Sequence, residues 1–510
     1  MRRIFIVGAA LLLAGGVPAA AQAPQPGEAE IETSRAAVAE ADVDRIYDDP
    51  DYARELLAHL DTLDAATGDS RARLAMDSLR LTALSVLERH DEIRTVVDRV
   101  LSRRPADPAI YRAAWWAALS IPDLPRAVAV AETASRHVRG IGWGEVREFM
   151  GSQVPGYVLI QLERDGDDAL RLRFAESLFR IGWPGGGDLE RTNDLRRILV
   201  DYRIEQGDHG AAADLAAGLT DPASLLSLIL LRRYDALFAT DEERLARLRT
   251  AISEYDRLTL QALGTEPTVG AAFDRARFLR RLGRERDALT LLEPFIRDVA
   301  GLVGADYRGI WVVNEAAYAL LSLDRGDEAV ELMERLVRIP LEANGDLIGP
   351  YINQSIILLE ADRPAEALAY ATRLEREFAG FASDYGKRLI DSSIVCALAA
   401  LGRASEAGPI LERLRAARED QPSPLTRAEL CLGNVDEAEA AVISRLEGEH
   451  PETIVLAFQD YLLESDAGPG PDRDDDRLMS LRDRPAVRQA LERVGRVLGL
   501  PLARLALGGT

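Results

Sequence analysis

One local feature constrains the fold of this 510-residue chain more than any other: the same turn recurs four times between residues 272 and 414. At each turn an apolar run gives way to a short polar stretch, and the next run opens with an acidic residue followed by alanine. The alanines stand 41, 38 and 40 residues apart, at Ala288, Ala329, Ala367 and Ala407. A unit of this length that keeps returning is typical of a solenoid, because one helix pair cannot cover its apolar faces without a neighbour.

The residue types within one unit favour two antiparallel helices. Apolar residues from Phe273 to Leu282 fall close to helical spacing, and Gly283 can adopt the left-handed conformation that ends a helix. Ala288 in the second helix has a small side chain that lets the two helix axes approach closely. Aromatic residues make up only 6% of the chain. The sequence therefore predicts an all-α fold, a right-handed α-solenoid of stacked antiparallel helix pairs.

This motif resembles the tetratricopeptide repeat (TPR) family. The matching features are the turn, the acid-alanine pair, the apolar residues that follow, and a small residue in the middle of the first helix, at Ala276, Ala317 and Ser355. An upstream stretch also has the family's spacing, at Leu81, Leu84, Ile93, Val97, Val100, Leu101 and Pro105. The units exceed the family's usual length of about 34 residues, and its tryptophan and tyrosine are mostly missing. The resemblance implies a TPR-like fold and a role in protein–protein interaction.

The turns and loops predict five segments along the chain. Residues 1–23 are expected to be a signal peptide, 24–138 to be N-terminal TPR-like repeats, and 139–265 to be divergent helical repeats with Trp/Gly loops. Residues 266–464 are expected to form C-terminal TPR-like repeats, and 465–510 an acidic linker with a capping helix.

The first segment has the parts of a secretory signal. Arg2 and Arg3 supply positive charge, an apolar run extends from Ile4 to Val17, and small residues around Ala21 provide a cleavage site. An uncleaved membrane anchor is the alternative, although the apolar run is shorter than the roughly 20 residues that a spanning helix needs. Lys387 is the single lysine among many arginines, a bias typical of GC-rich bacterial genomes. We expect a periplasmic or secreted protein of a Gram-negative bacterium, with no integral membrane segment once the signal is removed.

Charge and motif content argue against several functions. The formal net charge is −22, and a surface this acidic disfavours nucleic acids and anionic membranes as partners. The five histidines are scattered without metal-ligand spacing, and the chain has neither a G-x-S-x-G nor a G-x-x-x-x-G-K-[ST] motif. The acids that begin at Asp472 lack the glycine of a calcium loop. We therefore expect no catalytic residues, no metal and no cofactor, and a protein that is not an enzyme.

Two residue pairs leave alternatives open. The tripeptide Ile-Gly-Trp recurs in glycine-rich loops at Trp143 and Trp183. These tryptophans are either exposed anchors on one edge of the solenoid or, as we favour, packed between repeats. Cys396 and Cys431 are 35 residues apart, and two cysteines in an exported protein can form a disulfide. The repeat register, however, puts them about one turn out of step, which favours two buried free thiols.

One surface stands out as a partner-binding site. Six arginines lie between Arg275 and Arg286. The repeat register turns seven residues toward a concave groove: Arg277, Arg280, Arg281, Trp311, Asn314, Tyr318 and Asn353. Arginine and asparagine at such places resemble the groove of some TPR domains, where charge-assisted hydrogen bonds hold a peptide terminus. The alternative, which we favour, is that these arginines pair with Asp274, Glu285, Asp287 and nearby acids as a solvated face.

The sequence thus predicts an exported protein–protein interaction scaffold that binds a peptide or protein partner in the concave groove of a TPR-like solenoid. Two other functions remain open: a lytic or hydrolytic cell-envelope enzyme on a helical scaffold, and a structural envelope-assembly factor. Acidic residues clustered in a closed pocket would favour the enzyme, whereas an open, shallow groove would favour the scaffold. The identity of the partner and the oligomeric state do not follow from the sequence.

Overall fold

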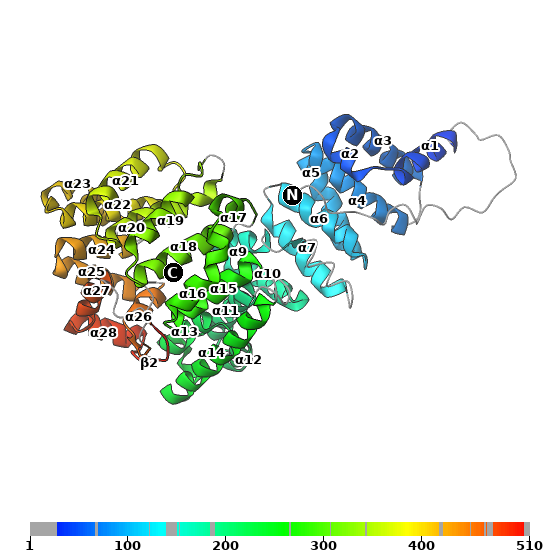
Figure 1. Cartoon of the computed structure of the whole chain (residues 1–510). Coiled ribbons are helices and arrows are strands. Elements are labelled where there is room, and N and C mark those ends of the chain that lie inside the picture. Colours follow the sequence, from blue (N-terminus) through cyan, green and yellow to red (C-terminus); the bar gives the residue numbers. More distant parts are fainter. Residues whose placement is uncertain are drawn as a thin grey trace. The chain divides into compact units, whose positions relative to one another are not determined.

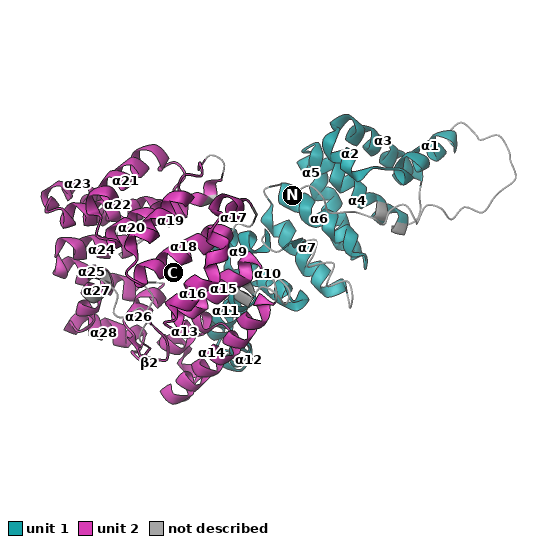
Figure 2. Ribbon diagram, in the orientation of Figure 1, with its two compact units in different colours: residues 1–218 teal, residues 219–510 magenta. Residues whose placement is uncertain are grey.

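A computed structural model describes residues 28–66, 70–121, 123–138, 150–151, 154–183, 189–264, 267–305, 308–341, 344–417, 422–448, 450–463, 466 and 473–503. The chain forms two compact units, residues 1–218 and 219–510 (Figure 2). Each unit is built from helices that pack against neighbouring helices (Figure 1). The predicted signal peptide lies outside the described residues.

Unit 1 is a stack of helix pairs. Helix α4 packs against α5, and the next pair continues the stack because α6 lies on α4 and α7 on α5. Aspartates cap several of these helices; Asp107, for example, accepts a hydrogen bond from the backbone N–H of Ala109 at 2.9 Å. The helices are α1 (Glu28–Ala39), α2 (Val43–Asp48), α3 (Pro50–Ala66), α4 (Ser70–Val86), α5 (His90–Arg103), α6 (Pro108–Ser120), α7 (Leu124–His137), α9 (Val154–Arg164), α10 (Asp168–Ile181), α11 (Leu189–Glu205) and α12 (His209–Ala217).

Unit 2 continues with further pairs and ends in short irregular elements. Its α-helices are α13 (Pro222–Leu230), α14 (Asp241–Leu263), α15 (Val269–Arg281), α16 (Glu285–Ile296), α17 (Val299–Ala305), α18 (Arg308–Ser322), α19 (Gly326–Leu336), α20 (Ile348–Glu360), α21 (Pro364–Phe378), α22 (Asp384–Ala400), α23 (Gly408–Ala416), α24 (Pro422–Leu432), α25 (Val435–Leu446), α26 (Glu452–Ala457), α27 (Arg473–Arg482) and α28 (Pro485–Val494). The 3-10 helices are η1 (Arg232–Leu237), η2 (Gly345–Leu347) and η3 (Ala404–Glu406), and the strands β1 (Asp460–Tyr461) and β2 (Gly499–Leu500) pair in parallel.

The recurring turn of the sequence has one backbone conformation. The residue that ends each first helix is left-handed, with φ of 72°, 58°, 57° and 71° at Gly283, Asp324, Asp362 and Gly402. The arginine after it forms an ion pair, at 2.6 to 2.7 Å, with the acid three residues later: Arg284–Asp287, Arg325–Glu328, Arg363–Glu366 and Arg403–Glu406. The acid of each acid-alanine pair is thus the partner of the turn arginine.

The four marker alanines lie inside the packed helices, as predicted. Ala288, Ala329 and Ala367 are 0% exposed and Ala407 is 1% exposed. First helices pack on first helices, since α15 contacts α18, α18 contacts α20 and α20 contacts α22. The predicted all-α solenoid of stacked helix pairs is therefore confirmed.

The boundary between the two units falls between residues 218 and 219, inside the predicted segment 139–265. Helix α10 packs on α7, so the stack continues past residue 138. Helix α14 packs on α15, where the rings of Tyr255 and Phe278 meet edge to face with centroids 5.1 Å apart. The turn pattern weakens in this region of the sequence, but helices pack on one another within each unit on either side of the boundary.

The end of unit 2 returns to its beginning, which the sequence did not predict. Helix α26 packs on α13, and Gly495 forms an isolated bridge with Leu231 (Figure 1). The N–H of Arg496 also donates to the carbonyl oxygen of Leu230 at 3.1 Å. A Cβ on Gly495 would lie 2.8 Å from a methyl group of Val455, so this close approach requires glycine. The predicted cap at 465–510 therefore does more than cover the last repeat, because it also contacts the first helix of the unit.

The two cysteines form a disulfide, so the favoured prediction of free thiols is wrong. Cys396 on α22 and Cys431 on α24 have Cα atoms 5.1 Å apart, within the range that a disulfide bridges. The second part of the repeat between them is short and consists of η3 and the nine-residue α23. Helix α24 packs directly on α22, as the other first helices pack on one another, and this packing brings the two cysteines together.

Candidate functional site

The structure separates the seven predicted groove residues into a buried set and a partly exposed set. Arg280, Asn314 and Tyr318 are 1%, 3% and 0% exposed, so they do not line an open groove. The predicted role in direct partner contact is wrong for these three. They are buried because α15, α18 and α20 pack directly on one another, and each of these side chains lies between two helices.

Arg280 is a structural residue. Its Nε lies 2.9 Å from a carboxylate oxygen of Glu285, and its Nη1 lies 2.6 Å from one of Glu315. Burial opposes the charge of Arg280, but attraction to Glu315 and Glu285 prevails and raises its pKa above the ordinary value. Burial raises the pKa of Glu285, and Arg280 opposes that shift. The guanidinium also lies 5.6 Å from the ring centre of Tyr318, which explains the place of that tyrosine.

The α15 end of the predicted groove is covered by the chain itself. The N–H of Ala503, in the segment after β2, donates to the carbonyl oxygen of Arg281 at 2.8 Å. Asp466 binds the following turn: its N–H donates to Gly283 at 2.7 Å, and its carboxylate accepts the N–H of Glu285 at 3.0 Å. The predicted groove is therefore not free for a partner along its whole length.

The other end of the same helices remains accessible. On α18 exposure falls from 36% at Trp311 to 3% at Asn314 one turn later. The Trp311 indole lies against α20, where a Cβ on Gly349 would be 3.2 Å from its ring. Asn353, one turn further along α20, is half-buried and donates from Nδ2 to Asn314 Oδ1 at 2.9 Å. We call the surface of α18 and α20 that carries Trp311 and Asn353 the inner face of unit 2. It offers a partner one exposed tryptophan, with the half-buried amide of Asn353 beside it on the same two helices.

The structure decides between the two alternatives for one of the two tryptophans, Trp183. Trp183 is 3% exposed, and its indole N–H donates to the carbonyl oxygen of Gly151 at 2.9 Å. An exposed anchor at Trp183 is therefore excluded, because the ring packs against the described helices of unit 1. Trp143 lies outside the described residues.

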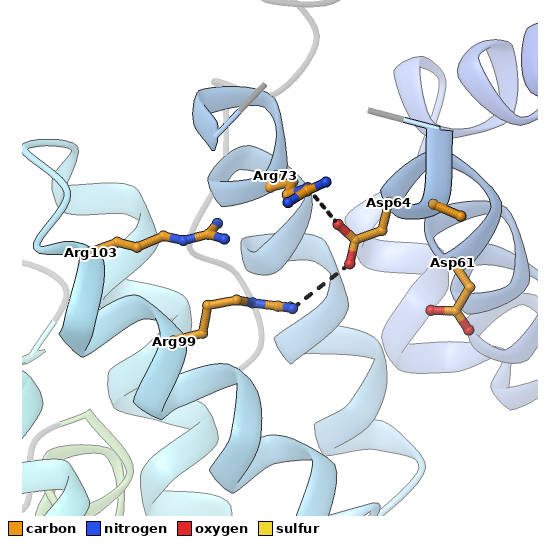
Figure 3. Close-up of a pocket in the computed structure, with 6 residues that line it drawn as sticks. Asp61, Asp64, Arg73, Arg99 and Arg103 are labelled. Carbon is orange, nitrogen blue, oxygen red and sulfur yellow. Dashed lines mark ion pairs between the residues drawn. The ribbon is translucent and has the colours of Figure 1, made fainter. Parts of the chain in front are cut away.

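The sequence did not predict a charged pocket in unit 1. It has a volume of about 360 Å³ and is lined by Asp61, Asp64 and Ala65 of α3, Arg73 of α4, and Arg99 and Arg103 of α5 (Figure 3). The spacing of Arg99 and Arg103 puts both on one face of a helix, which was a usable signal. The pocket also contains Asp61 and Asp64 of α3 and Arg73 of α4. Their position beside α5 could not be predicted, because it depends on how α3, α4 and α5 pack together.

No metal-like cluster occurs among the described residues: no three histidine, cysteine, aspartate or glutamate side chains gather as a metal ion would require. Nor does any helix in the described ranges combine the length and apolar character needed to cross a membrane.

Comparison with known proteins adds little to this picture. No protein-family model matches the chain, and no curated protein matches it. Among solved structures it is similar to the TPR domain of P58(IPK), with 11% sequence identity, 89% of this chain and 99% of that chain covered, and a TM-score of 0.19. The class of this protein rests on its own helices: it is an α-helical repeat protein of stacked helix pairs.

Proposed function

We propose that this protein is an exported, TPR-like scaffold that binds a peptide or protein partner on the inner face of unit 2, at Trp311. The observation that carries the proposal is the exposed indole on α18, held against Gly349 of α20. Tryptophan is one of the side chains enriched among the residues that dominate binding energy at protein interfaces. Half-buried Asn353 supplies a nearby polar group that can orient a partner's backbone.

One further observation supports export, and a second favours a scaffold over an enzyme. The disulfide between Cys396 and Cys431 suits an exported protein, since such bonds persist in oxidising compartments. The aspartates in the unit 1 pocket already have partners: Asp61 binds Arg80, and Asp64 lies 3.2 Å from Arg73. Carboxylates held in this way are poorly placed for general acid or base catalysis, so we favour a scaffold without enzymatic activity.

The test compares two exposed aromatic residues of unit 2. Phe381, 43% exposed, lies in the turn between α21 and α22 rather than on α18 or α20. Trp311→Ala should weaken partner capture from envelope extracts at least about tenfold, whereas Phe381→Ala should leave it unchanged. A photo-reactive amino acid at position 311 should cross-link the captured partner, and one at position 381 should not. Equal capture by both variants, or cross-linking at 381 alone, would refute the assignment.

A further inference from the structure

The unit 1 pocket is built from charged side chains. Five of its six lining residues are arginine or aspartate, and they come from the C-terminal half of α3, the first turn of α4 and the last two turns of α5 (Figure 3). Binding pockets for drug-sized molecules have volumes from about 300 Å³ upward and are mostly apolar. A volume of about 360 Å³ with this lining therefore suits a small, strongly charged ligand.

The aspartates do not use up the positive charge around the pocket. Asp61 binds Arg80. Asp77, which is 2% exposed, accepts a hydrogen bond from Arg99 Nε at 3.0 Å. Asp64 is shared among three arginines: Arg73 at 3.2 Å, Arg99 at 3.7 Å and Arg80 at 3.8 Å. The two longer separations exceed a hydrogen bond, so Asp64 leaves donor capacity on these arginines.

Arg103 is the fourth arginine around the pocket. Unlike Arg73, Arg80 and Arg99, it forms none of the ion pairs described above. Its Nη1 is buried and has no hydrogen-bond partner, although a buried donor normally finds one. Figure 3 shows its guanidinium pointing toward the space beside Arg73 and Arg99, with no dashed ion pair to the residues drawn. The four arginines and three aspartates named here have a net charge of +1, in a chain whose net charge is −22.

We propose that this pocket binds a small oxyanion, a carboxylate or a phosphate, held by Arg73, Arg99 and Arg103. Guanidinium groups donate in a planar fork that matches these anions, and both anions share this chemistry. This site lies in unit 1 and is independent of the partner site proposed at Trp311 in unit 2.

Calorimetric titration of the full chain tests the proposal, with inorganic phosphate and citrate as separate probes and sodium chloride at matched ionic strength as the reference. We expect saturable binding of at least one probe, and the stronger probe identifies the anion class. Arg103→Gln should weaken that binding about tenfold or more, because a hydrogen bond to a charged group is lost. Arg103→Lys should recover part of it.

The matched control is Arg104→Gln, which removes the same charge from the next, exposed residue, outside the pocket lining. This control should change the affinity less than twofold. Thermal unfolding should show both variants folded, since Arg103 Nη1 has no partner to lose. Absence of saturable binding by both probes, or equal losses in the Arg103 and Arg104 variants, would overturn the proposal. Binding of an acidic peptide without either small anion would overturn it too.

Discussion

Arg280 offers the sharpest test of the structure, because the sequence leaves two roles open for it and the structure decides between them. From the sequence, Arg280 either contacts a partner or pairs with nearby acids such as Glu285. The structure buries it between Glu285 and Glu315, whose side chains are 4% and 6% exposed. In Arg280→Met the methionine approximately fills the space but leaves two carboxylates buried without their cation. Removing one member of a buried ion pair costs about 3–5 kcal/mol of unfolding free energy. With two acids stranded, we expect the upper part of that range.

The loss should depend on pH in a defined direction. Burial raises the pKa of Glu285 even with Arg280 present, and removing the cation should raise it further. An acid whose pKa is raised in the folded state stabilises that state when protonated and loses this contribution as pH rises through the folded pKa. The deficit of Arg280→Met should therefore be smaller at pH 5 than at pH 8.

The assay is urea unfolding of the full chain, with hydrogen exchange of peptides from α15 to α18 to assign the change to this region. Arg284→Met is the matched control, since Arg284 is half exposed and its pair with Asp287 lies at the surface; it should cost no more than about 1 kcal/mol. Adding Glu285→Gln and Glu315→Gln to Arg280→Met should recover most of the unfolding free energy that Arg280→Met loses. If Arg280→Met unfolds like the control, the buried cluster is not structural and the reasoning fails.

Two further predictions concern the disulfide and a helix end. Replacing both Cys396 and Cys431 by alanine should lower the unfolding free energy by about 3–4 kcal/mol, since the disulfide closes a loop of 35 residues in the unfolded chain. Urea unfolding with and without reductant measures this loss. A loss below about 1 kcal/mol would contradict the prediction. Gly402→Ala should cost about 1 kcal/mol, because φ is +71° and no atom lies within 4 Å of the added methyl. Gly380→Ala, with equal space and no positive φ, should cost nothing measurable; equal losses would contradict the backbone explanation.

The sequence predicted best those features that depend on interactions between residues close together in the chain. A left-handed residue, an arginine and an acid three positions later act within one turn, as at Asp362, Arg363 and Glu366. The helix pairs and their inward alanines were therefore predictable. The disulfide was not, because its geometry depends on how α22 and α24, which carry the two cysteines, pack on each other.

The predicted groove shows why periodicity falls short of a binding site. Spacing correctly put Trp311, Asn314 and Tyr318 on one face of a helix. It carried no information on how much of that face neighbouring helices bury, or on the segment ending at Ala503 that reaches Arg281. Exposure along one helix face is decided by contacts between residues far apart in the chain.

The sequence by itself determined an all-α chain that must stack its helix pairs, since a recurring turn and amphipathic helices leave no other way to bury the apolar faces. Only the tertiary structure decided what each charge does. Two arginines that look alike in the sequence end in opposite situations: Arg280 is held by two buried acids, and Arg103 keeps a buried nitrogen without a partner. The difference arises because solvation and pairing depend on which distant residues the fold brings together.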